Sequence, residues 1–243
     1  MPDPTAWIIL LGTALAGSVI GGVAGFGAGV VLLPVVAWTV GLRAAVPIMT
    51  VTMLVGNLSR LWWSRGEIDR AVAVRFLAGA LPATAVGAIL YAGTPSTALS
   101  LVIGVFLLAS VPLRRFLASP VVQIRLRHFP VVGAVFGFLS SLVVTTGPVV
   151  TPFFLAYGLR RGAYIATEAA CAFAMHGVRG AVLARYALLT WETIAIGCAL
   201  GGTMFAGSWL GRRLLDRMSD RVFLRVIEAL LIVMGLHFVL FPR

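Results

Sequence analysis

The first part of the chain is an apolar stretch that is too long for a single membrane crossing. No charged residue occurs between Pro4 and Leu42. An unbroken helix of this length would extend about 58 Å, nearly twice the roughly 30 Å of a bilayer's hydrocarbon core. Between Gly21 and Gly29, five of nine residues are glycine. Because glycine permits tight turns, the pattern predicts a helical hairpin that enters and leaves the membrane on one side.

Apolar segments continue along the chain and predict an all-α, polytopic integral membrane protein. A second hairpin is expected at 129–158. Six further segments are predicted as single crossings: 44–63, 71–91, 96–113, 163–184, 190–211 and 222–241. Composition agrees, since 60% of the 243 residues are hydrophobic, 11% are charged and the mean hydropathy is +1.03. Soluble domains of ordinary composition do not reach these values.

The distribution of arginine predicts the orientation of the crossings. Most arginines fall in clusters at 65–75, 114–127, 160–161 and 212–225. The positive-inside rule places these clusters in the cytoplasm, so the links between them face outside. In a soluble chain the net charge of +11 would suggest nucleic acid, but the basic residues form no helix or arm suited to a groove. We therefore expect the lipid bilayer, and no nucleic acid, as a partner.

The two halves of the chain resemble each other at a spacing of 117 to 120 residues. The matching positions are Gly41-Leu42-Arg43 with Gly158-Leu159-Arg160, Pro34 with Pro152, Arg60 with Arg179, and Gly87 with Gly207. The expected organisation is a first repeat at 1–117, a cytoplasmic linker at 118–128 and a second repeat at 129–243, in one membrane domain. Each repeat is a hairpin plus three transmembrane helices, so the second copy is expected to be inverted. Inverted repeats with interrupted helices are typical of secondary transporters, although a duplicated bundle without a substrate is the alternative.

Several motifs, taken in order, resemble the sulfite exporter TauE/SafE family of bacterial permeases. They are Gly25-Phe-Gly-Ala-Gly-Val-Val-Leu-Leu-Pro34, Gly41-Leu42, Gly56-Asn57-Leu58-Ser59-Arg60, Gly137-Phe-Leu-Ser140, Thr145-Thr-Gly-Pro148 and Thr151-Pro-Phe-Phe154. The resemblance covers nearly the whole chain. It implies a multi-pass protein of the bacterial inner membrane that moves sulfite, sulfonates or other small organic anions. One departure is Ser141-Leu-Val-Val144, where the second hairpin of the family is usually rich in glycine.

The bends of the two hairpins are the first candidate substrate-binding elements. A helix that begins inside the membrane presents unpaired N–H groups and the positive end of its dipole to an anion. The candidate residues are Gly25, Gly27 and Gly29 in the first bend, with Thr145, Thr146, Gly147 and Thr151 in the second. The threonines can instead bond to carbonyls of their own helix. The alternative for the first bend is close packing of small residues.

Two arginines within predicted crossings are further candidates for substrate binding. Arg60 and Arg179 occupy equivalent repeat positions, with Asn57 and His176 three residues before them. A spacing of three places each pair on one helix face. An arginine in the membrane is costly and normally faces a partner or a wet path, and its planar fork suits a sulfonate or carboxylate. The alternative for Arg60, which precedes Trp62, is snorkelling to the headgroups.

Glu168 is a candidate for proton coupling, because burial favours the neutral form of a carboxyl. Its alternative is a residue of the first helical turn that complements the helix dipole or pairs with Arg160 or Arg161. The sequence leaves open whether a proton or a sodium ion is coupled, whether transport is inward or outward, and whether the protein forms a homodimer.

The combined prediction is a permease that moves small anions by alternating access. A passive anion channel and a non-transporting accessory membrane protein are the alternatives. An enzyme is not expected, because the chain has no H-E-x-x-H motif and no pair of membrane aspartates. No metal site and no cofactor are expected either.

Overall fold

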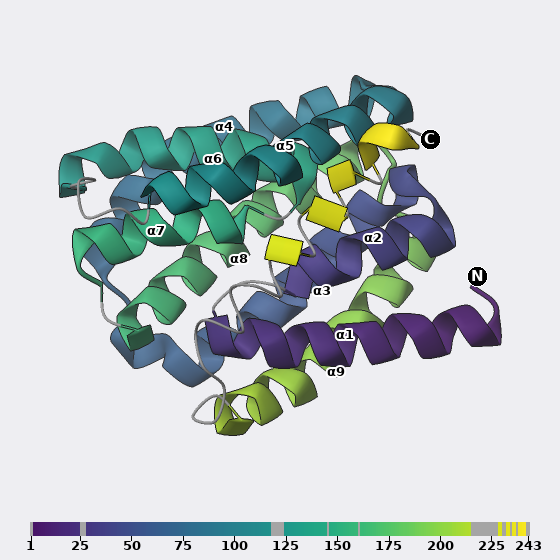
Figure 1. The fold of residues 1–243 in the computed structure, drawn as a ribbon, viewed down its shortest axis with the longest axis horizontal. Helices are drawn as coiled ribbons and strands as arrows, with labels where there is room; N and C mark the ends of the chain where they lie inside the picture. Colours follow the sequence, from purple (N-terminus) through teal and green to yellow (C-terminus); the bar gives the residue numbers. More distant parts are fainter. Residues whose placement is uncertain are drawn as a thin grey trace.

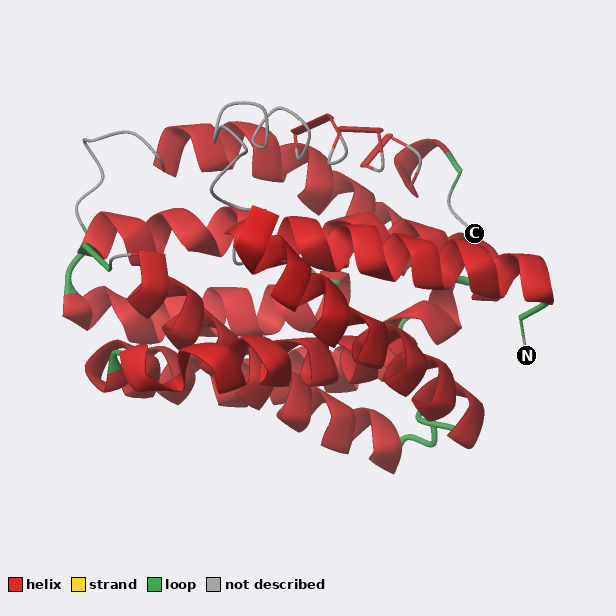
Figure 2. Ribbon diagram, turned by 90° about the horizontal axis from the view of Figure 1, so that it is seen from below, coloured by secondary structure: helices red, strands yellow, loops and turns green. Residues whose placement is uncertain are grey.

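The computed structural model describes residues 2–24, 28–117, 124–144, 146–159 and 161–214, and near the carboxyl end 228–229, 232–233, 235–236 and 238–241. Regular structure in these ranges is helical throughout (Figure 2). The helices are α1 (Pro4–Ala24), α2 (Ala28–Val40), α3 (Leu42–Ser64), η1 (Arg65–Glu67), α4 (Arg70–Gly93), α5 (Ser96–Leu117), η2 (Leu126–His128), α6 (Phe129–Val143), α7 (Gly147–Tyr157), α8 (Arg161–Arg185) and α9 (Trp191–Leu214). The all-α prediction is confirmed.

Five segments in the described ranges are long and apolar enough to cross a membrane. They are Leu42–Trp62, Arg70–Gly93, Ser96–Leu113, Leu126–Val143 and Trp191–Leu210. Helix α8 has 25 residues, which is also a sufficient length, but it carries several polar side chains. The exposed surface of the bundle includes large apolar side chains, such as Ile8, Val74 and Val131. Such a surface is expected where helices face lipid.

The chain turns back in both predicted hairpins, and the returning helix is short in each. Helix α1 has 21 residues, whereas α2 has 13 and α7 has 11. At 1.5 Å per residue, α2 and α7 extend only about 20 Å and 17 Å, so neither crosses a bilayer. In Figure 1, α1 begins at the right end of the bundle and α6 at the left end. The two short helices therefore begin inside the protein.

Local sequence explains where the helices begin and end. Asp69 caps α4 by accepting a hydrogen bond from the backbone N–H of Val72 at 3.0 Å. Pro148 lies in the first turn of α7, where its missing N–H is not needed. Gly41 follows α2 and Gly158 follows α7, and both adopt positive φ, 84° and 104°. These two glycines occupy equivalent positions in the predicted repeat, and each permits the turn into the next long helix.

The described end of the chain runs beside α5 in the opposite direction. Arg115, near the end of α5, forms a bidentate pair with Glu228, with N···O distances of 3.1 and 2.5 Å. At the other end of α5, the hydroxyl of Ser100 donates to the carbonyl oxygen of Phe238 at 2.9 Å. The described residues after 227 therefore follow the direction predicted for the crossing at 222–241.

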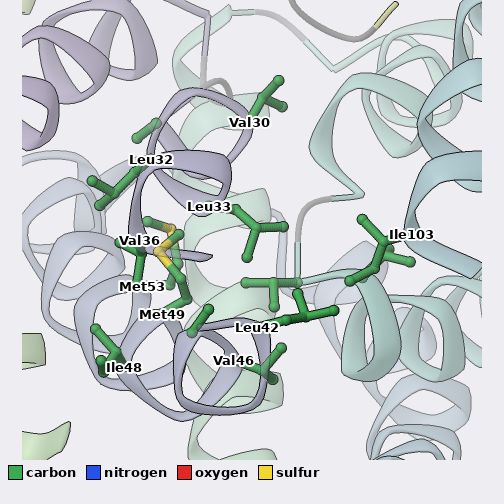
Figure 3. Packing of buried hydrophobic residues seen from close by; sticks show 14 of the residues in the cluster. Val30, Leu32, Leu33, Val36, Leu42, Val46, Ile48, Met49, Met53 and Ile103 are labelled. Atoms are coloured by element: carbon green, nitrogen blue, oxygen red, sulfur yellow. The ribbon is translucent and has the colours of Figure 1, made fainter. Parts of the chain in front are cut away.

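The central helices α3 and α8 pack on each other and are covered by two long helix pairs, α4 with α6 and α1 with α9 (Figure 1). Helix α4 also packs on α8, and α9 packs on α3. Apolar side chains of α2, α3 and α5 pack together in one buried cluster, which includes Leu33, Met49 and Ile103 (Figure 3). The polar residues of α3 and α8 are thus enclosed by the bundle.

Glycines bring α4 and α6 into backbone contact. A methyl group added at Gly79 would lie 1.8 Å from the carbonyl oxygen of Pro130, and one added at Gly133 would lie 2.0 Å from that of Phe76. Such close approach is the usual role of small residues between membrane helices. Gly207 of α9 is similarly close to Ser18 of α1.

Candidate functional site

A small cavity lies where the two short helices begin. It holds about 80 Å³ and is lined by Gly29 of α2 and by Thr146 and Gly147 at the start of α7. Its walls also include Asn57 and Arg60 of α3 and Glu168 and His176 of α8. Seven of the residues named from the sequence therefore line one hollow, although they come from positions 29 to 176 of the chain.

The helix ends give this cavity a positive character. The first turn of a helix leaves backbone N–H groups without intrahelical partners, and its dipole is positive at that end. At the start of α7 the carbonyl of Thr146 already accepts the N–H groups of Val149 and Val150, both at 3.0 Å. The regular hydrogen bonding of α7 therefore begins at the cavity wall.

Arg60 lies between two oxygen acceptors in the cavity wall. Its Nη1 atom is 2.9 Å from Oε2 of Glu168, and its Nη2 atom donates to Oδ1 of Asn57. The side chains of Arg60 and Glu168 are 15% and 11% exposed. Snorkelling to the headgroups is therefore the wrong interpretation of Arg60, because its guanidinium is engaged inside the bundle.

Glu168 has a partner on another helix that the sequence did not suggest. The carboxylate pairs with Arg60 of α3, whereas Arg160 and the side chain of Arg161 lie outside the described part of the structure. Glu168 is also the eighth residue of α8, which begins at Arg161, so it lies beyond the first turn. The helix-dipole alternative is therefore wrong. The contact joins two helices that pack on each other at the centre of the bundle.

Arg179 is buried and is in contact with His176. It is 1% exposed, and its Nη2 atom is 2.7 Å from Nδ1 of His176. Its Nη1 atom donates to the carbonyl oxygen of Ser140 at 2.5 Å. Ser140 and His176 line the cavity, whereas Arg179 does not. The positive charge of Arg179 therefore lies one residue away from the cavity.

The candidate hydroxyls divide into two groups. Thr151 donates to the carbonyl of Gly147 at 2.6 Å and is 2.7 Å from the hydroxyl of Tyr164, so it bonds within the protein and does not line the cavity. Thr146 is in the cavity wall. Gly25, Gly27 and Thr145 lie outside the described residues.

Some lining residues were not singled out in the sequence. Ser18 of α1 and Ser208 of α9 reach the cavity from the helix pair on the side of the first hairpin, and Ser140 reaches it from α6. Serines are common in membrane helices, so only their position beside the bends distinguishes these three. Val144, at the second bend, also lines the cavity, with a φ of 63°.

These features define an integral membrane protein with a central polar cavity between two interrupted helices. Residues 9–238 match the family model "Sulfite exporter TauE/SafE". The chain belongs to this family, whose members are membrane transporters. No curated protein and no solved structure gives a significant match to the chain.

Proposed function

We propose that the protein is a secondary transporter of small sulfur-containing or organic anions, such as sulfite, sulfonates or carboxylates, in the bacterial inner membrane. The cavity between the two short helices is the proposed binding site. The observation that carries the proposal is that the beginnings of α2 and α7 meet in one cavity with Arg60 and His176. Donors and positive charge converge there on a space of about 80 Å³, which suits a small ligand.

The balance of charge at the site favours an anion. Two helix beginnings, Arg60 and the buried Arg179 face one carboxylate, Glu168. A negative ligand is stabilised by this arrangement, whereas a cation would meet positive helix ends. The low dielectric of the membrane interior strengthens each of these interactions.

A second hollow supports alternating access. This hollow, which we call the vestibule, holds about 910 Å³ and is lined by Gly41, Arg43, Ser96 and Thr190, among others. Its residues lie at the end of the bundle that the arginine pattern places outside. Along α3, the buried residues Val46 and Met49, 0% exposed, lie in the sequence between the residues that line the vestibule and those that line the cavity. An apolar barrier on one side of a binding site is the expected form of a closed gate.

Ligand binding tests the proposed site most directly. The purified protein is heated in detergent with sulfite, thiosulfate, sulfonates and dicarboxylates in turn, and a bound anion raises the melting temperature. Choline, a cation of similar size, is the control. The proposal fails if no anion in the panel stabilises the protein.

Flux in proteoliposomes tests the mechanism. Alternating access predicts saturable uptake and acceleration of uptake by the same anion on the opposite side. Unitary currents would instead indicate a channel, and absence of flux for any stabilising anion would indicate an accessory protein.

A further inference from the structure

The ion pair between Arg60 and Glu168 occupies the cavity that the proposed anion must enter. Both residues line it, and the pair joins α3 of the first half to α8 of the second. We propose that Glu168 is a proton-binding site coupled to the anion: its carboxylate neutralises Arg60 in the empty protein, and an incoming anion replaces it on Arg60 as Glu168 takes up a proton. This inference rests on the proposed function.

The geometry makes the carboxylate and the anion competitors. Arg60 presents Nη1 to Glu168 and Nη2 to Asn57. A sulfonate or carboxylate binds arginine through the same pair of nitrogens. If Glu168 stayed ionised, two negative charges would share one arginine at a site where the side chains of Arg60 and Glu168 are only 15% and 11% exposed. Like charges that close disfavour each other's ionised form. Protonation of Glu168 removes this repulsion.

Among the described residues, Arg60 is the cation in direct contact with the carboxylate of Glu168. Tyr164 and Cys171 lie one turn before and one turn after Glu168 on α8, and neither a phenol nor a thiol ordinarily carries a charge near pH 7. Glu67 of η1 lies near Gly162, at the start of α8. The backbone N–H of Asp69, just before α4, donates to Thr167 at 2.9 Å.

On the cavity side, most of the groups near Glu168 carry no charge. Asn57 of α3 shares Arg60 with it, and Phe76 of α4 and Phe154 of α7 contribute apolar walls. His176 lies two turns along α8 and accepts a hydrogen bond from Arg179. A proton gained at this site therefore goes to Glu168 more readily than to His176, whose Nδ1 is occupied.

The two halves of the protein differ at this point, which indicates a special role for the carboxylate. Arg60 and Arg179 are 119 residues apart, and the position 119 residues before Glu168 is Met49. Arg179 contacts a carbonyl and an imidazole, whereas Arg60 contacts a carboxylate. A helix in this position therefore does not need an acidic residue to pack, and Glu168 provides a titratable group on one side only.

Proton uptake on anion binding is the decisive measurement. The probe is isethionate, a sulfonate that keeps a single charge between pH 5 and pH 9. Its binding to the full-length protein in detergent is measured by calorimetry in buffers of different ionisation enthalpy, which gives the number of protons taken up per anion. Near pH 7.5 we expect close to one proton per isethionate, and an affinity that falls about tenfold per pH unit where Glu168 is ionised.

The substitution Glu168→Gln replaces the carboxyl with an uncharged amide, which resembles protonated Glu168 at every pH. We expect E168Q to bind isethionate with no proton uptake, and with an affinity independent of pH and no weaker than that of the wild type at low pH. The matched control is Glu67→Gln, the same chemical change at an exposed residue of η1, which should behave as the wild type. In proteoliposomes, a pH gradient should drive accumulation by the wild type and E67Q but not by E168Q, which should still exchange anion for anion.

The possible failures are distinct. Binding of isethionate by the wild type without proton uptake overturns this inference and leaves the proposed function intact. Proton uptake that persists in E168Q also overturns it, because the proton then binds elsewhere. If E168Q does not fold, the wild-type measurement decides alone, and Glu168→Asp, which keeps a carboxylate, should retain proton uptake. If the wild type binds no anion of the panel, the proposed function fails, and this inference fails with it.

Discussion

The guanidinium of Arg179 and the imidazole of His176 are joined by a 2.7 Å hydrogen bond that determines which nitrogen of the histidine carries the proton. A guanidinium can only donate, so Nδ1 of His176 accepts and the proton of the neutral ring is on Nε2. His176 lines the cavity and Arg179 does not. The arginine therefore acts on the cavity through the ring, by holding it in the form that offers an N–H donor.

Replacing His176 with asparagine should separate its role as an acceptor for Arg179 from its role as a donor in the cavity. The amide oxygen of asparagine can still accept from Arg179, but the donor at the position of Nε2 is lost. We expect the dissociation constant for isethionate to rise about tenfold or more, since a hydrogen bond to a charged group contributes roughly 1.5 to 3 kcal/mol. Calorimetry measures the change. His128→Asn, on η2, is the matched control, and equal affinities for the two variants would contradict the donor role.

Replacing Arg179 with leucine should abolish saturable uptake without loss of stability. Arg179 is 1% exposed, and no described residue offers a hydrogen-bond partner to its Nε atom. A buried charge held by neutral groups is costly, so its removal lowers the desolvation penalty of folding. The carbonyl of Ser140 would still accept the N–H of Val144, at 2.9 Å.

The melting temperature in detergent and isethionate uptake in proteoliposomes measure the two effects of R179L. Arg75→Leu, at an exposed position of α4, serves as the control and should leave uptake as it is in the wild type. Unchanged uptake kinetics in R179L would remove Arg179 from the mechanism.

Val144 should give an inverted order of stability between glycine and alanine. This residue has a φ of 63°, which is unfavourable for a β-branched side chain. Both substitutions remove the buried side chain, but only glycine relieves the backbone. We therefore expect V144G to be more stable than V144A by about 1 kcal/mol, the reverse of the order inside a helix. Thermal unfolding of the two variants in the same detergent tests this, and a more stable V144A would show that the backbone is not strained.

Gly133 should not tolerate a methyl group. An added Cβ would lie 2.0 Å from the carbonyl oxygen of Phe76, so α4 and α6 would have to separate. We expect G133A to lose at least about 1 to 3 kcal/mol of stability, the usual cost of overpacking. In contrast, Gly202 of α9 has no atom within 4 Å of such a group, so G202A should be neutral or stabilising by up to about 1 kcal/mol. Equal melting temperatures would contradict the close helix contact.

Much of the fold follows from patterns that the sequence carries locally. The charge-free run from Pro4 to Leu42 requires a turn because a bilayer has a fixed thickness. The spacing of three between Asn57 and Arg60, and between His176 and Arg179, predicted neighbours on one helix face, and both pairs are hydrogen-bonded. The equivalence of the two halves stays a prediction, which the positive φ of both Gly41 and Gly158 supports.

The contacts between helices could not be predicted in this way. Arg60 and Glu168 are 108 positions apart, and no local pattern shows that α3 and α8 pack on each other. A threonine such as Thr151 can bond to its own helix or to a ligand, and only the fold shows that it bonds to Gly147. The positive φ of Val144 could not be predicted either, because valine is not a residue that is typical of turns.

The glycine-lined contact between α4 and α6, and the packing of α1 on α9, have a consequence for biogenesis. Each pair combines an early helix with one that the ribosome synthesises much later. During insertion, the faces of α1 and α4 that later pack on α9 and α6 should therefore be in contact with lipid until the second half is synthesised. We therefore expect that neither half folds by itself: each made alone should be degraded, whereas co-expression of residues 1–117 with 118–243 should restore a stable complex.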